Sequence, residues 1–353
     1  MSSNKLKYFK NLDALRAFAA IAVIFAHYFD QNKVAKDTAL FKLFALGNSG
    51  VSLFFVLSGF VITRILIQTV NSDNYFKSFY LRRTLRIFPL YYFALACYYF
   101  IPPLIDGSNH FELNSKQLYY VFYLQNFART FNWDSVGPAH FWSLAVEEHF
   151  YFLWPAIVFF CLKLNLKTLI NISFFIIVLA HLLRAVMSYN GYEINVFTFT
   201  RIDQLVFGGL IAVYEKKGFL IEENKQKFIA LIVIGFLGIV TIELQNSVLL
   251  KEVFKHTFFG LLYGGLLMYV VISEKSVFVN QLLQNKLIQY LGKISYGIYV
   301  WHVLAISIVN TYFSLNIYFG FILTLFITIL ISWGSFQIIE SPFLKLKSKF
   351  NYK

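Results

Sequence analysis

Residues 12–29 read LDALRAFAAIAVIFAHYF, an apolar segment long enough to span much of a bilayer. Burying the ionisable groups of Arg16 and His27 there should cost about a few kcal/mol each, so something must offset that cost. Eleven positions at about 100° per residue make three turns plus about 20°, which puts both side chains on one face, roughly 16 Å apart along the axis. A cation near one membrane surface is thereby aligned with a proton-transfer group deep in the helix. This arrangement suggests a site reached from both sides of the membrane.

The composition of the whole chain agrees with a membrane protein. Of its 353 residues, 58% are hydrophobic and only 14% are charged, and the mean hydropathy is +0.61. These values indicate a polytopic membrane protein and exclude a soluble globular core. Cys97 and Cys161 lie in apolar stretches near opposite membrane faces, so we expect neither a disulfide nor a thiolate metal site.

The hydropathy pattern predicts an all-α, polytopic transmembrane bundle of about ten spanning helices. The expected spans are 12–29, 50–70, 79–101, 141–162, 168–188, 197–214, 228–245, 254–273, 290–312 and 317–339. One membrane domain, residues 1–353, uses the whole chain, because no linker or internal repeat is evident. Residues 117–127 (QLYYVFYLQNF) are too short to span and are predicted to lie at the membrane interface.

The placement of lysine and arginine predicts that both termini are cytoplasmic. With that orientation, 20 of the 31 Lys and Arg residues lie in inner segments and seven lie in outer loops. The net charge of +13 then needs no nucleic acid partner to explain it. A basic N-terminus before an apolar stretch is also typical of signal peptides, but Arg16 and His27 favour a retained first helix.

Two arginines open the third expected helix at its cytoplasmic end. Arg83 and Arg86 in the stretch RRTLRIFPLYY (82–92) lie one turn apart on one side of that helix. Paired guanidinium groups there are suited to clamp phosphates bidentately. The alternative is that they are positive-inside anchors without a ligand.

The fourth expected helix carries a carboxylate into the membrane. In HFWSLAVEEHFYFLWP (140–155), Ser143, Glu147 and the Phe150/Tyr151 pair follow one another on one face. Glu147 should lie at a depth comparable to that of His27, so a His–carboxylate pair is sterically plausible. An intramembrane Glu is functional by default, and the alternative is a structural ion pair or a solvated cavity.

Taken together, these stretches resemble the acyltransferase-3 family of integral-membrane O-acyltransferases. The elements that carry the resemblance are LDALRAFAAIAVIFAH (12–27), FFVLSGFVITR (54–64), RRTLRIFPLYY (82–92), WSLAVEEHFYFLWP (142–155), TRIDQLVFGGLIA (200–212) and SYGIYVWHVLA (295–305). Arg-x10-His alone is a weak signal. Combined with Arg-x-x-Arg and Ser-x3-Glu-x2-Phe-Tyr in this order and at these depths, it is specific.

The resemblance implies a donor and a reaction. Acetyl-CoA, as co-substrate, would dock from the cytoplasm with its phosphates near Arg83 and Arg86, assisted by Arg16. His27 would act as general base on an acceptor hydroxyl, with Glu147 orienting the imidazole. Further support would come from Ser143 and Tyr151. Direct transfer and an acyl-enzyme both remain open, as does a longer acyl chain.

The resemblance also implies a location and partners. Members of this family commonly acetylate hydroxyls of bacterial surface glycans from the inner (cytoplasmic) membrane, and many carry a fused extracytoplasmic SGNH-type domain. This chain ends at Lys353 without one. We therefore expect it to act alone on its acceptor, in contact with membrane lipid, or to hand the acyl group to a separate extracytoplasmic protein.

Four further side chains belong to matched or adjacent positions. Asp13 lies one turn before Arg16 and is expected either to pair with it or to serve the site. Arg201 and Asp203 match a family Arg-x-Asp element, with a local structural role as the alternative. His302 matches a segment of the ninth helix, with packing as the alternative. No metal is expected, because the remaining histidines show no metal-ligand spacing. These are His110, His140, His149, His181 and His256.

Two other classes of protein compete with an enzyme. A transporter or flippase of a glycan precursor would also bury charges, but its halves usually show repeated hydropathy and matching broken helices, which this sequence lacks. A non-catalytic membrane scaffold gives no reason to align Arg16, His27 and Glu147 at such cost.

Overall fold

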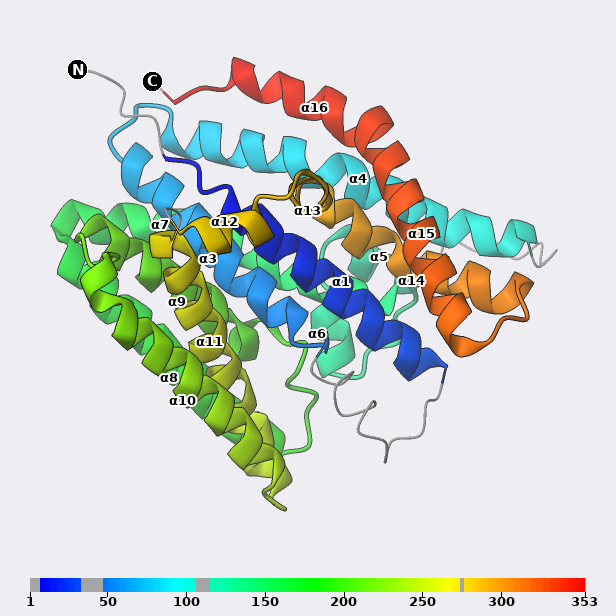
Figure 1. The fold of residues 1–353 in the computed structure, drawn as a ribbon, viewed down its shortest axis with the longest axis horizontal. Helices are drawn as coiled ribbons and strands as arrows, with labels where there is room; N and C mark the ends of the chain where they lie inside the picture. Colours follow the sequence, from blue (N-terminus) through cyan, green and yellow to red (C-terminus); the bar gives the residue numbers. More distant parts are fainter. Residues whose placement is uncertain (1–6, 33–46, 106–114, 274–275, 353) are drawn as a thin grey trace.

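The protein is a bundle of α-helices (Figure 1), seen in a computed structural model that describes residues 7–32, 47–105, 115–273 and 276–352. The long helices are α1 (Asn11–Gln31), α3 (Gly50–Thr69), α4 (Tyr75–Ile105), α7 (Trp142–Leu164), α8 (Leu166–Tyr189), α9 (Thr198–Lys216), α10 (Lys225–Glu243), α11 (Val248–Ile272), α14 (Ser295–Tyr312) and α15 (Ile317–Ser335). Shorter elements are α5 (Ser115–Val121), α6 (Gln125–Thr130), the 3-10 turns η1 (Ala139–Phe141) and η2 (Glu222–Asn224), α12 (Val277–Leu283), α13 (Lys286–Lys293), a π-helical turn (Phe336–Glu340) and α16 (Ser341–Leu346). No strand occurs within these ranges.

The expected all-α polytopic bundle is confirmed. In the described ranges, eight helices are long and apolar enough to cross a membrane, and nine if the bent pair α13–α14 is one span. Helix α9 corresponds to the sixth expected span, 197–214, although it fails that hydropathy test. It carries Arg201 and Asp203 but is buried along most of its length, so neighbouring helices and not lipid surround it.

The ninth expected span, 290–312, is not one straight helix. Its first part belongs to α13, which meets α14 at an angle of 75°. Gly292 of α13 packs directly on α1, where a Cβ would lie 1.9 Å from the carbonyl oxygen of Asp13. The Gln289 side chain also ties α13 to its neighbours, since it donates hydrogen bonds to the carbonyls of Lys10 and Leu283.

Two other boundaries differ from the sequence prediction. The interfacial segment 117–127 forms parts of two short helices, α5 and α6, because the chain turns at Tyr123, whose φ is +58°. Helix α11 begins at Val248, six residues before the predicted start, because Ser247 caps it by accepting a hydrogen bond from the Leu250 amide. Hydropathy alone marks neither feature.

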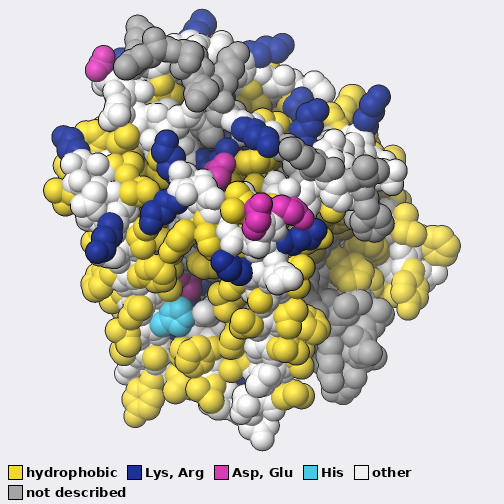
Figure 2. Space-filling view, turned by 60° about the vertical axis from the view of Figure 1, so that its left-hand side comes forward, with side chains coloured by type: hydrophobic (Ala, Val, Ile, Leu, Met, Phe, Trp, Pro, Cys, Tyr) yellow, Lys and Arg dark blue, Asp and Glu magenta, His cyan; other side chains and the backbone are white. Residues whose placement is uncertain are grey.

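Both described chain ends meet the same end of the bundle, beside the turn between α3 and α4 (Figure 1). Arg64 of α3 donates to the carbonyl of Lys7, and Asn74 donates to the carbonyl of Asn351. Lys and Arg side chains gather over the upper part of the face in Figure 2, while hydrophobic side chains cover its middle and lower parts. This multi-pass arrangement agrees with an even number of spans. That the shared side is cytoplasmic stays a prediction.

Candidate active site

A cavity lies between α1, α3, α4, α7 and α14 and contains about 910 Å³ of space, counting its open mouth. Polar and charged side chains from all five helices line it: Arg16, Ser58, Arg83, Arg86, Ser143, Glu147, Glu148, Tyr151, Ser295, Tyr296 and Tyr299. Phe54, Phe55 and other apolar residues complete the wall. The candidate donor-binding residues and the candidate catalytic carboxylate Glu147 therefore share one space.

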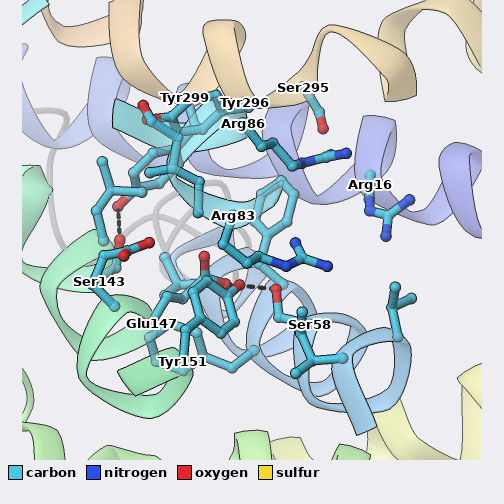
Figure 3. Close-up of a pocket in the computed structure, with 18 residues that line it drawn as sticks. Arg16, Ser58, Arg83, Arg86, Ser143, Glu147, Tyr151, Ser295, Tyr296 and Tyr299 are labelled. Carbon is cyan, nitrogen blue, oxygen red and sulfur yellow. Dashed lines mark hydrogen bonds between the residues drawn. The ribbon is translucent and has the colours of Figure 1, made fainter. Parts of the chain in front are cut away.

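Three guanidinium groups gather at one side of the cavity. Figure 3 shows Arg83 and Arg86 reaching from α4 toward the space that Arg16 of α1 faces. Arg16 is paired with Asp13 at 2.8 Å, as the i, i+3 spacing predicted, and Tyr8 also donates a hydrogen bond to Asp13. Part of the charge of Arg16 is thus already neutralised.

Arg83 and Arg86 differ from Arg16, since neither forms a hydrogen bond or an ion pair with any residue that the structure describes. The Arg83 guanidinium lies over the rings of Phe79 and Tyr151, at 5.9 and 5.5 Å from their centroids. Ring faces attract a cation but leave its N–H donors free for another ligand. These two side chains therefore offer donors to an anion.

Arg82, their neighbour in sequence, points elsewhere. It donates to the carbonyls of Lys347 and Phe350 and to the side chain of Asn351. It therefore holds the C-terminal segment against α4 and does not line the cavity.

Two carboxylates of α7 face the arginines across the cavity. Glu147 accepts a hydrogen bond from Ser58 of α3 at 2.7 Å (Figure 3). Its neighbour Glu148 also lines the cavity, and Glu148 Oε1 is buried with no hydrogen-bond partner among the described residues. Tyr151 follows one turn later on the same helix. The predicted face of Ser143, Glu147 and Tyr151 is thus directed into one cavity.

Ser143 and Tyr299 lie on the side of the cavity away from the three guanidinium groups (Figure 3). Their hydroxyl groups lie 2.5 Å apart, and the Tyr299 hydroxyl also donates to the carbonyl of His140 at 2.7 Å. Ser143 was predicted to support the site of His27 and Glu147. In the structure its partner is Tyr299.

The predicted pairing of His27 with Glu147 is wrong. His27 Nδ1 lies 2.7 Å from Nε2 of His302, and the planes of the two rings differ by 19°, with centroids 5.0 Å apart. Glu147 is instead held by Ser58. The cause is the position of α14, which packs on α1 and fills the space that the prediction left for α7. His302 is therefore more than a packing residue.

His27 also does not appear in the wall of the cavity. It is connected to that wall through two hydrogen bonds, since His302 contacts the carbonyl of Tyr299 at 2.6 Å. A donor bound at the arginines would therefore have to extend past Tyr299 for its thioester to approach the His27 imidazole.

Arg201 and Asp203 lie outside the cavity, in a buried polar network. Asp203 pairs with the fully buried Arg184 of α8 at 2.9 Å. Arg201 contacts His256 of α11 at 3.0 Å and Gln204 at 3.2 Å. These contacts join α8, α9 and α11, which favours the local structural role. The Arg201 guanidinium lies 5.6 Å from the ring centroid of Phe55, a residue of the cavity wall.

Glu148 and the α14 residues Ser295, Tyr296 and Tyr299 were not among the predicted site residues, whereas His302 of the same helix was. Ser295, Tyr299 and His302 follow one another at i, i+4 and i+7, so a helical wheel of the predicted ninth helix would have placed them on one face. No group of three His, Cys, Asp or Glu able to hold a metal is found among the described residues. His110 lies outside those residues.

The bundle and its cavity define a class of protein, a multi-pass membrane protein with a cationic pocket beside buried carboxylates and imidazoles. A family model described as an acyltransferase domain matches residues 9–337. The chain belongs to this acyltransferase family.

Two curated relatives are similar to the chain over most of its length. "Putative O-acetyltransferase SACOL0978" of Staphylococcus aureus (strain COL) is 28% identical over 97% of this chain. "O-acetyltransferase OatA" of S. aureus (strain NCTC 8325 / PS 47) is 25% identical over 96% of it. The match spans 58% of the length of each relative. No solved structure matches the chain.

Proposed function

We propose that this protein is an acyl-CoA-dependent O-acetyltransferase that moves an acetyl group from cytoplasmic acetyl-CoA to a hydroxyl of an extracytoplasmic or cell-surface glycan. Its setting would be a bacterial cytoplasmic membrane. The observation that carries the proposal is the cavity in which the unpaired Arg83 and Arg86 face Arg16 beside Glu147. The family and the names of its relatives support the transfer of an acetyl group to oxygen.

The phosphate groups of the proposed donor account for the unpaired arginines in the cavity. Coenzyme A carries several phosphate charges at one end and a thioester at the end of a long flexible arm. Guanidinium groups bind phosphate oxygens through two parallel N–H donors, and unpaired ones keep those donors available. With the phosphates at Arg83 and Arg86, the arm would run along the cavity toward Ser143 and Tyr299.

The reaction needs a base for the acceptor hydroxyl. In direct transfer, His27 would take the hydroxyl proton while the oxygen attacks the thioester carbonyl. The carbon–sulfur bond then breaks, and the coenzyme thiolate leaves with the proton that the imidazolium returns. The products are the glycan ester and free coenzyme A. Because Tyr299 and His302 separate His27 from the cavity, the thioester would have to reach the Ser143–Tyr299 end of it.

The acceptor would arrive from the outer side, where the predicted orientation places His27. A glycan hydroxyl or a separate extracytoplasmic acyl-accepting protein would fulfil the same chemical role, since each presents an alcohol to the base. Membrane lipid would surround the exposed apolar side chains, such as Phe152, Phe175 and Phe326.

Binding of acetyl-CoA to the purified protein tests the donor half of the proposal. Arg83→Ala should weaken binding at least tenfold, whereas Arg82→Ala should not, because Arg82 faces the C-terminal segment. The acceptor half is tested by NMR of acetyl groups on surface glycans from a deletion strain and its complemented counterpart. Equal affinity in both variants, or equal acetyl content in both strains, would overturn the respective half.

A further inference from the structure

Three histidines from three separate elements gather behind the cavity. His27 of α1 contacts His302 of α14, and the ring of His140 in η1 lies edge-on to His302 with centroids 4.8 Å apart. His140 and His302 are buried, and His302 has no exposed surface. His140 contacts the carbonyl of Val300 at 3.2 Å. Both of these rings are therefore anchored to the backbone of α14.

The protonation of His302 follows from its partners. His302 Nδ1 lies 2.6 Å from the carbonyl oxygen of Tyr299, and a carbonyl only accepts, so Nδ1 must carry the hydrogen. A neutral ring then has its lone pair on Nε2. The charged form is disfavoured because burying an unpaired cation costs far more than burying a neutral, hydrogen-bonded ring.

The tautomer of His27 follows from that of His302. Since His302 Nε2 is an acceptor, the His27 Nδ1 that lies 2.7 Å away must donate to it. The other ring nitrogen of a neutral His27, Nε2, then holds the free lone pair. No residue in the described ranges hydrogen-bonds to that nitrogen.

We infer that His302 is a positioning residue that fixes His27 in the Nδ1–H tautomer and so presents Nε2 as the base. A carboxylate usually plays this part beside a catalytic or metal-binding histidine. Here a second imidazole does so. The Tyr299 carbonyl, which can only accept a hydrogen bond, determines which nitrogen of each imidazole carries the hydrogen. The tautomer follows from the geometry alone, while its use as a base rests on the proposed function.

Tyr299 connects this chain of hydrogen bonds to the cavity. Its carbonyl holds His302, and its hydroxyl lies in the cavity wall against Ser143 and the carbonyl of His140. The residue that orients the histidines therefore also borders the space assigned to the donor. The orientation of His27 Nε2 thus depends, through His302, on the backbone of Tyr299.

Two substitutions separate the hydrogen bond from the shape of the side chain. In His302→Gln the amide oxygen can still accept from His27 Nδ1, whereas His302→Leu fills similar volume and accepts nothing. Membrane vesicles from a host strain that lacks the gene, supplied with radiolabelled acetyl-CoA, measure transfer to the host's own glycans. We expect His302→Leu to lower kcat about 10²- to 10³-fold with little change in the KM for acetyl-CoA, and His302→Gln to stay within about tenfold of the wild type. Wild-type kcat in His302→Leu would overturn the inference.

Nitrogen NMR of the full-length, ¹⁵N-histidine-labelled protein in detergent provides a readout besides activity. The His27 signals are assigned by their loss in His27→Gln. We expect a protonated, pyrrole-type Nδ1 and a bare, pyridine-type Nε2 in the wild type, and loss of this preference in His302→Leu. The reverse pattern in the wild type would overturn the inference. If the vesicles transfer no acetyl group at all, the proposed function fails, while the NMR pattern still decides the tautomer.

Discussion

Gly59 of α3 lies so close to Leu205 of α9 that a Cβ atom at Gly59 would come within 1.8 Å of the Leu205 carbonyl oxygen. Gly208 repeats the contact one turn along α9, against the carbonyl of Val56. Small residues are what lets membrane helices approach backbone to backbone. This contact seats the polar helix α9 against α3, one position from Ser58, the partner of Glu147.

We therefore expect Gly59→Ala to destabilise the protein. The added methyl group cannot fit without moving α9, and overpacking of this kind costs about 1–3 kcal/mol or more. The loss of stability is measured as a lower melting temperature in detergent, with size-exclusion chromatography reporting the fraction that remains folded. Gly334→Ala is the matched control, because nothing lies within 4 Å of a Cβ at that helical position. Equal melting temperatures for the two variants would contradict the packing argument.

The ion pair between Arg184 and Asp203 should be a stabilising and not a catalytic element. Asp203→Ala leaves the fully buried Arg184 without its counter-charge, which typically costs about 3–5 kcal/mol. The double variant Arg184→Leu/Asp203→Leu should recover part of this loss, because it removes both charges. Thermal unfolding measures the stability, and acetyl-CoA binding of the folded fraction should stay unchanged. A normal melting temperature with lost binding would instead assign Asp203 to the site.

The spans followed from hydropathy because lipid demands long apolar helices, and that signal is local in sequence. Hydropathy could not reveal the 75° bend between α13 and α14, since the bend depends on Gly292 meeting the backbone of α1. The span 197–214 was expected and is α9, but the partners on other helices that satisfy its Arg201 and Asp203 were not. Such satisfaction is a property of packing and is invisible in a sequence window.

The candidate site was predictable where the residues share one helix. The pair Arg83 and Arg86 and the face of Ser143 and Glu147 follow from helical spacing, and both line the cavity. Which helices are neighbours did not follow. Depth alone suggested Glu147 as the partner of His27, and many helix arrangements bring groups of equal depth within reach of each other.

The three cavity arginines should not contribute equally to donor binding. Arg83→Ala and Arg86→Ala each remove unpaired donors, and charge-assisted hydrogen bonds are worth about 1.5–3 kcal/mol, or roughly ten- to a hundredfold in Kd. Arg16→Ala should weaken binding less, because Asp13 already neutralises part of its charge. Titration calorimetry with acetyl-CoA ranks the variants. A larger loss for Arg16→Ala than for the other two would show that Arg16 is the principal phosphate ligand.

Glu147→Gln should lower kcat without weakening the binding of the acetyl donor. Glutamine keeps the shape of the side chain and can still accept the hydrogen bond from Ser58, so the packing of α3 and α7 is preserved. The negative charge is lost, which raises the net positive charge facing the anionic donor, and binding should be equal or tighter. If the carboxylate takes part in the chemistry, kcat should fall by about 10²-fold or more. Vesicle transfer rates and acetyl-CoA affinity, measured on the same preparation, separate these effects, with Ser58→Ala as a milder control that keeps the charge. A wild-type kcat in Glu147→Gln would restrict Glu147 to holding α3 and α7 together.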